Sequence, residues 1–151
     1  MAILNYSTKI DAWQTVNEIQ QILVKHKATH FSIRNEGSRP VALSFSIDFK
    51  SQPLNFLLPV NYKGISKILQ NPTDVMKKTL SGKKIKPDDE QAFRVGWRVV
   101  KDWIEAQLAL VEVEMVKMEE VFLPYLIINQ SGDTLSKKMF EGDGLKQISN
   151  G

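Results

Sequence analysis

Apolar residues recur along the chain with two different periods, and the change of period separates helical from extended regions. In the first region they return at spacings of three and four, on one line: Ala12, Val16, Ile19 and Leu23. This spacing predicts an amphipathic helix over residues 11–26. Asp11 is placed to cap it, and Trp13 and Ile22 are expected to widen its buried face.

Residues 29–60 alternate between apolar and polar positions, which is typical of strands with one buried face. The clearest run is VALSFSIDF, residues 41–49, in which five apolar side chains point the same way: Val41, Leu43, Phe45, Ile47 and Phe49. The segments THFSI (29–33) and LNFLLPV (54–60) flank this run across short, turn-rich connections. Short connections favour antiparallel neighbours, so we expect a three-stranded antiparallel sheet.

The helical period returns after Pro87, where acidic residues at 88–90 suit the positive end of a helix. One apolar stripe follows: Phe93, Trp97, Val100, Ile104, Leu108, Val111, Met115, Met118 and Phe122. A second line widens it: Val99, Trp103, Ala106, Leu110 and Val113. No strong helix breaker occurs before Pro124, so the pattern predicts one helix of about 35 residues. Trp97 and Trp103 are expected to be packing residues on adjoining faces of that helix.

These elements predict an α+β fold, with the N-terminal helix and the sheet followed by a short helix at 62–70 and the long helix packed on the sheet. Residues 1–128 are expected to form a single domain that contains a flexible basic loop at 71–86. Residues 129–151 read as a polar, partly disordered tail with a short helical turn at 135–140.

A straight helix of the predicted length exceeds the size of its own domain. About 35 residues at 1.5 Å each span about 50 Å, whereas a compact domain of this chain length is about 40 Å across. Either the helix kinks, with Gly96 as the candidate position, or its C-terminal half packs on another subunit. Apolar residues continue to the end of the predicted helix. We therefore expect a homo-oligomer, most simply a two-fold dimer, with these interface residues: Met115, Met118, Val121 and Phe122.

Composition excludes several classes of protein. The chain has no cysteine, which removes disulfides and thiolate sites and fits a reducing, cytoplasmic setting. No secretory signal or membrane span is expected. His26 and His30 lack further ligands for a metal shell, and a helix N-terminus explains Asp88, Asp89 and Glu90. Without a catalytic triad or a glycine-rich phosphate loop, we expect no enzyme, no metal and no cofactor.

The net charge of +3 is unevenly distributed. Between Lys63 and Lys86 there are seven lysines and one acid, Asp74. Lysines in a loop can contact phosphates or another polyanion without reading bases, although a solvated loop is the simpler explanation. The candidate nucleic-acid-binding residues are Lys77, Lys78, Lys83, Lys84, Lys86, Arg94 and Arg98. On the long helix, local ion pairs are expected between Arg98 and Asp102 and between Lys101 and Glu105.

Three segments carry a family resemblance: AILNYSTKI near the start, SFSIDF, and RVGWRVVKDWIEAQLALVEVEMVKMEEVFLPYL. Over about its first 130 residues the chain resembles an uncharacterised family of small proteins encoded by bacteriophages, prophages and other mobile elements. The first helix of that family usually ends in His-Gly-Ala, whereas this one ends in His26-Lys27-Ala28. A residue other than glycine must therefore end the helix in this protein.

The resemblance implies a protein that acts in the host cytoplasm by binding. One expected class is a DNA-associated accessory protein that uses the lysine-rich loop together with Arg94 and Arg98. The other is a counter-defence inhibitor, for example of a CRISPR nuclease, that binds a host nucleic-acid-binding protein. Both classes remain open at the level of the sequence.

Overall fold

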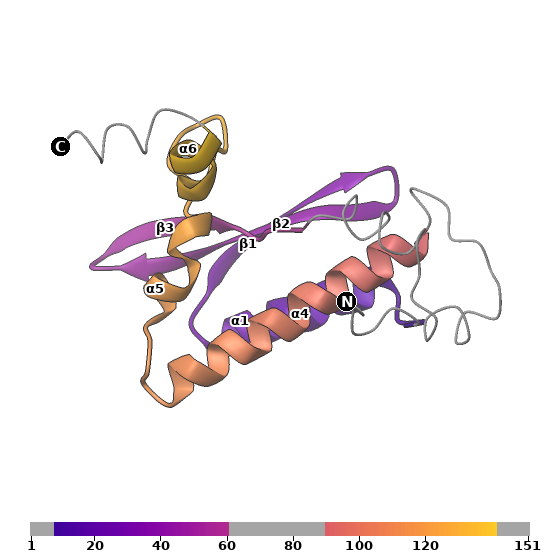
Figure 1. Cartoon of the computed structure of the whole chain (residues 1–151), viewed down its shortest axis with the longest axis horizontal. Helices are drawn as coiled ribbons and strands as arrows, with labels where there is room; N and C mark the ends of the chain where they lie inside the picture. Colours follow the sequence, from indigo (N-terminus) through magenta and orange to yellow (C-terminus); the bar gives the residue numbers. More distant parts are fainter. Residues whose placement is uncertain (1–7, 61–89, 142–151) are drawn as a thin grey trace.

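A computed structural model describes residues 8–60 and 90–141 of the protein (Figure 1). Its elements are α1 Ala12–Lys25, β1 Thr29–Glu36, β2 Arg39–Phe49, β3 Gln52–Leu57, α4 Glu90–Glu112, α5 Met118–Phe122, the 3-10 helix η1 Leu123–Tyr125 and α6 Leu135–Glu141. The predicted α+β class is confirmed. The helix expected at 62–70 and the loop expected at 71–86 lie outside the described residues.

Helix α1 forms where the sequence predicts it. The Asp11 carboxylate accepts a hydrogen bond from the backbone N–H of Trp13 at 3.2 Å, which satisfies a donor that the first turn would leave free. The predicted apolar line is buried in the core: Ala12, Val16, Ile19 and Leu23. The expectation for Trp13 was wrong, because its side chain lies about 100° around the helix from Ala12 and remains 40% exposed.

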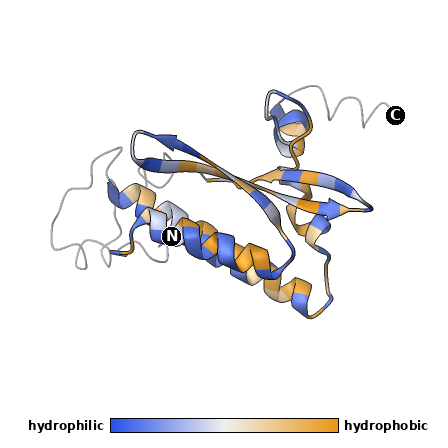
Figure 2. Ribbon diagram, turned by 180° about the vertical axis from the view of Figure 1, so that it is seen from behind, coloured by the Kyte–Doolittle hydropathy of each residue, from blue (hydrophilic) through white to orange (hydrophobic). Residues whose placement is uncertain are grey.

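The three strands form the expected antiparallel sheet in the order β1-β2-β3. Phe45 at its centre pairs with Phe31 on β1 and with Phe56 on β3. The β1–β2 hairpin turns at Gly37, whose φ of 62° suits a residue without a side chain. Apolar and polar positions alternate along the strands (Figure 2), so the sheet has one apolar face and one largely polar face.

The helices α1 and α4 lie side by side under the apolar face of the sheet and run in the same direction (Figure 1). Contacts along the pair keep the same order in both helices, from Gln91 beside Thr8 to Glu112 beside His26. Trp97 is fully buried between α4 and the sheet. Its indole N–H donates to the Pro40 carbonyl at 2.9 Å, which confirms its prediction as a packing residue.

The prediction of one unbroken helix up to Pro124 was wrong, because α4 ends at Glu112. The backbone N–H of Glu114 donates to the Val111 carbonyl, and that of Met115 donates to the Leu110 carbonyl, both at 3.0 Å. This pair of bonds defines a Schellman C-cap, which requires a left-handed residue after the helix. Glu114 takes that conformation with φ of 60°, although glycine is the usual choice there.

The chain then reverses direction, and α5 packs against the sheet and α4. The ring of Phe122 is completely buried, with its centroid 5.2 Å from that of Phe45 and 5.8 Å from that of Trp103. Trp103 itself is only partly buried. The second apolar line of α4 is less covered than expected, since Leu110 is 38% and Val113 is 61% exposed.

The 23 residues of α4 span about 35 Å, which is within the size of the domain, so helix length gives no reason to expect a dimer. Of the four predicted interface residues, Phe122 lies in the core of its own chain, and Met118 and Val121 pack against that core. Only Met115 is widely exposed, at 72%. A homo-oligomer stays a prediction, but an overshooting helix no longer supports it.

The segment after η1 covers the outer edge of β3. The backbone N–H of Ile127 donates to the Asn55 carbonyl at 2.8 Å, and that of Leu135 donates to the Leu126 carbonyl at the same distance. These bonds lead into α6, which confirms the short helix expected near residues 135–140. The pairing satisfies part of the backbone of an edge strand that would otherwise be open.

Candidate functional site

The N-termini of α1 and α4 and the tip of the β1–β2 hairpin meet at one end of the molecule, on the right in Figure 1. We call this region, residues 8–13, 36–39 and 90–94, the hairpin end. Its three parts are joined by polar contacts. The indole N–H of Trp13 donates to the Ser38 carbonyl at 2.8 Å, and the Gln91 side-chain amide donates to the Thr8 carbonyl at 2.9 Å.

An ion pair and a cation–π contact complete these connections. The Arg39 guanidinium on the hairpin pairs with the Glu90 carboxylate on the first residue of α4. The same guanidinium lies 4.8 Å from the centroid of the Phe93 ring. Arg39 thus links the hairpin to α4 while 32% of its side chain stays open to solvent.

The electrostatics of the hairpin end favour anions. Two parallel helices place their N-termini there, and each N-terminus carries about half a positive charge. Lys9 is exposed beside them, and Arg94 is partly exposed. Three acids also lie there: Asp11 caps α1, Glu90 binds Arg39, and Glu36 is exposed on the hairpin. They balance the three cations Lys9, Arg39 and Arg94, so the positive field of this end comes from the two helix N-termini.

The predicted nucleic-acid-binding residues divide into three groups in the structure. The five lysines Lys77, Lys78, Lys83, Lys84 and Lys86 lie outside the described residues. Arg94 lies at the hairpin end, where its guanidinium donates to the Gln91 side chain at 3.4 Å. Arg98 lies one turn further along α4 and faces α1, away from that end.

Arg98 belongs to a cross-helix ion-pair cluster. Its guanidinium bonds to the Glu18 carboxylate of α1 at 2.5 Å, and the Lys101 ammonium lies 3.9 Å from the same carboxylate. Lys101 also forms the predicted pair with Glu105. The side chains of both cations are only 14% exposed, and the Arg98 Nε is buried without a hydrogen-bond partner in the described part of the chain.

The cluster perturbs the Glu18 carboxyl. Partial burial raises its pKa, but hydrogen bonds from Arg98 and Gln14 and the charges of Arg98 and Lys101 lower it by more. The net effect holds the pKa of Glu18 below its usual value. Arg98 therefore stabilises the packing of α1 on α4 and is not available to a phosphate group, so the candidate surface retains Arg94 but not Arg98.

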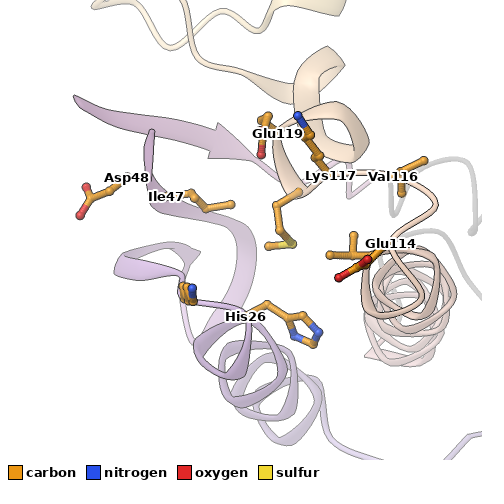
Figure 3. A pocket seen from close by; sticks show the side chains of 10 residues that line it. His26, Ile47, Asp48, Glu114, Val116, Lys117 and Glu119 are labelled. Atoms are coloured by element: carbon orange, nitrogen blue, oxygen red, sulfur yellow. The ribbon is translucent and has the colours of Figure 1, made fainter. Parts of the chain in front are cut away.

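A pocket of about 680 Å³ lies at the opposite end, where both helices finish (Figure 3). Its walls include Ile47 and Val111, and its rim carries charges of both signs, among them Lys117 and Glu119. His26 borders it and bonds to the Glu112 carboxylate at 3.2 Å. Because the charges are mixed, the pocket favours no single class of ligand.

The two histidines have different polar partners. His26 bonds to Glu112 and to the Ile22 carbonyl, whereas His30 bonds to the Thr29 hydroxyl. Within residues 8–60 and 90–141, no group of three or more histidine, aspartate or glutamate side chains is arranged to hold a metal ion.

Comparison with known proteins found no similar protein. Neither a protein-family model nor a curated protein nor a solved structure matches the chain. Across the described ranges, no helix combines the length and the apolar character needed to cross a membrane. We therefore infer the function from the geometry of the hairpin end.

Proposed function

We propose that the protein acts by binding DNA, with the lysine-rich segment 77–86 contacting phosphate groups beside the hairpin end. The protein carries out no reaction in this proposal and requires no cofactor. It works in the cytoplasm of a host cell, as an accessory protein encoded by a bacteriophage or another mobile element.

The proposal is supported by the position at which the lysine-rich segment joins the described fold, directly before α4. Lys86 precedes Glu90, the first residue of α4, by four residues. A fully extended chain of four residues spans about 14 Å, so covalent geometry limits how far Lys86 can be from the hairpin end. The chain that carries the lysines therefore enters the described fold at the end where two helix N-termini and Arg94 favour anions.

The salt dependence of DNA binding tests the proposal. Each phosphate contact contributes a slope of about −0.9 when the logarithm of the binding constant is plotted against that of the salt concentration. Changing Lys77, Lys78, Lys83, Lys84 and Lys86 to glutamine should weaken binding and reduce the slope by up to about 4.5. Arg94→Gln should reduce it by about 1, while Arg98→Gln should act on stability instead.

A matched control separates local contacts from net charge. Five exposed lysines away from the hairpin end are changed to glutamine in one variant: Lys25, Lys27, Lys50, Lys117 and Lys138. This variant loses the same five charges, so it should keep a slope close to that of the original protein. Equal loss of slope in both variants, or no affinity of the original protein for DNA, would refute the proposal.

A second function is favoured by the apolar side chains that remain exposed in the segment that follows α4. Val113 is 61%, Met115 is 72% and Leu123 is 48% exposed, and side chains of this kind contribute to protein interfaces. They support an alternative in which the protein inhibits a host defence nuclease by binding its surface. Binding to one host protein that is insensitive to salt, without affinity for bare DNA, would favour this alternative.

Capture of partners from an infected host distinguishes the two functions. A partner that is lost after nuclease treatment supports the DNA-associated function, and a partner retained after treatment supports the inhibitor. The same exposed side chains keep a two-fold dimer as a proposal. Light scattering at micromolar concentration should give twice the mass of the chain, and a monomeric mass would refute the dimer.

A further inference from the structure

Trp13 is the one widely exposed tryptophan of the chain, and the fold holds its ring in place. Trp97 is fully buried and Trp103 is partly buried, whereas Trp13 is 40% exposed. The bond from its indole N–H to Ser38 joins residues 25 positions apart in the sequence. The indole is therefore fixed against the hairpin, and a ligand that contacts it does not have to immobilise it first.

A second flat group lies next to it along the hairpin. Ser38 receives the Trp13 bond, and the following residue, Arg39, holds its guanidinium plane over Phe93. Glu90 fixes that guanidinium from α4. Indole rings and guanidinium planes are the surfaces on which unpaired bases stack in complexes with single-stranded nucleic acid.

The surroundings agree with a polyanionic ligand. Trp13 and Arg39 lie at the end where two helix N-termini converge. Lys9 and Glu36 are both exposed there and offset each other, so the helix N-termini supply the positive field. Single-strand binding combines such a positive surface with stacking groups, because the backbone and the bases are then bound together. Bases inside a duplex are stacked on one another and present no open face to an indole ring.

We propose that the hairpin end binds single-stranded DNA, with the Trp13 indole stacking on one base and the Arg39 guanidinium supporting a neighbouring one. This inference rests on the proposed DNA-associated function and specifies its substrate as the unpaired strand. In this arrangement phosphate contacts set the strength of binding to any DNA, and Trp13 adds the preference for single strands.

The test compares oligo(dT) of about 15 nucleotides, a length within the range that such sites cover, with a duplex of equal length. Trp13→Ala should weaken binding of the oligonucleotide about tenfold, as loss of one stacked base predicts, and leave duplex binding unchanged. Trp13→Phe should retain most of the affinity, because a phenyl ring still stacks. Val24→Ala, which removes an exposed side chain from the same helix, should change neither affinity.

Tryptophan fluorescence gives an independent readout that folding defects do not imitate. Addition of oligo(dT) should quench the emission of the original protein, since the exposed indole stacks on a base. In Trp13→Phe the remaining emission comes from Trp97 and Trp103, and the oligonucleotide should leave it unchanged. Equal quenching in both proteins would overturn the stacking role.

The outcomes also separate this inference from the function on which it rests. If the protein binds oligonucleotide and duplex equally and Trp13→Ala affects neither, the DNA-associated function stands and the single-strand inference is wrong. If the protein binds no DNA of either kind, the proposed function itself is wrong. A selective loss of oligonucleotide binding in Trp13→Ala supports both.

Discussion

The end of α1 allows a sharp test of the local physics, because Lys27 holds a backbone conformation that lysine rarely adopts. Its φ is 70°. Its backbone N–H donates to the Val24 carbonyl, and that of Ala28 donates to the Leu23 carbonyl, both at 3.0 Å. These bonds form a Schellman motif in which Lys27 occupies the position that glycine usually takes.

The expected gain from Lys27→Gly follows from two opposing contributions. A side chain in the left-handed region costs about 1–2 kcal/mol, and glycine removes that cost. Glycine also makes the unfolded chain more flexible, which offsets about 0.5–1 kcal/mol. The net expectation is a gain of about 1 kcal/mol, or about 2–4 °C in Tm for a domain near this size. Lys27 is exposed, and within residues 8–60 and 90–141 its side chain forms no ion pair or hydrogen bond. Its replacement therefore removes mainly a positive charge near the helix C-terminus.

Comparison with alanine removes that effect of charge. Lys27→Ala loses the same charge but keeps the strained backbone, so Lys27→Gly should be the more stable of the two by about 1 kcal/mol. At Gln21, an exposed position inside α1, the order should reverse, because glycine in a helix is about 1 kcal/mol less stable than alanine. Glycine should thus be more stable than alanine at position 27 and less stable at position 21. This reversal is expected only if Lys27 occupies a left-handed cap position.

Urea unfolding followed by far-ultraviolet circular dichroism provides the assay. The midpoint should shift while the m-value stays constant, since the surface exposed on unfolding is nearly the same in all four variants. If glycine is no better than alanine at position 27, the left-handed conformation of Lys27 carries no strain and the reasoning is refuted.

Other positions give further tests. Trp97→Ala should cost about 3–5 kcal/mol in urea unfolding, and Trp103→Ala should cost less because it is only partly buried; the reverse order would contradict the described core. Because the pKa of Glu18 is lowered on folding, its contribution is present above pH 4.5 and is lost as the pH falls through the lowered value. Glu18→Gln should thus reduce stability at pH 7 and flatten its decline on acidification, whereas an unchanged decline would count against the cluster. Lys50 and Ser51 both have positive φ, 49° and 65°, so replacing them with Asn-Gly should raise Tm, and a fall would show that the turn is not strained.

Local patterns predicted those parts of the fold that local forces determine. Strict alternation in residues 41–49 predicted β2 and its buried face, and the spacing in residues 11–26 predicted α1. The end of α4 was missed because the usual signals, glycine or proline, are absent there and Glu114 supplies the left-handed conformation. When a residue other than glycine adopts the left-handed conformation of a cap, the spacing of apolar residues does not change. The helix end is therefore invisible in the hydrophobic pattern.

The candidate site was only partly predictable for a related reason. The sequence identifies Arg94 and Arg98 as neighbouring cations, but it does not reveal that Glu18, 80 positions away, binds Arg98. It also places Trp13 on a buried face, whereas Trp13 lies beside that face and is 40% exposed. Helical spacing by itself does not show that its indole bonds to Ser38, 25 positions away. Contacts between distant elements decide which charges are used within the fold and which remain for a ligand.

The parallel packing of α1 and α4 has a consequence for binding. Two helices that run side by side in the same direction bring like partial charges together at both ends, which is unfavourable. Cross-helix pairs in the middle, above all that of Arg98 with Glu18, hold the helices together against this repulsion. At the hairpin end the repulsion between two positive ends falls when an anion binds, so a bound phosphate chain should also stabilise the fold. Under the proposed DNA-associated function, stability and DNA binding are coupled at the hairpin end, and stability measured with and without oligonucleotide should report on the same contacts as affinity.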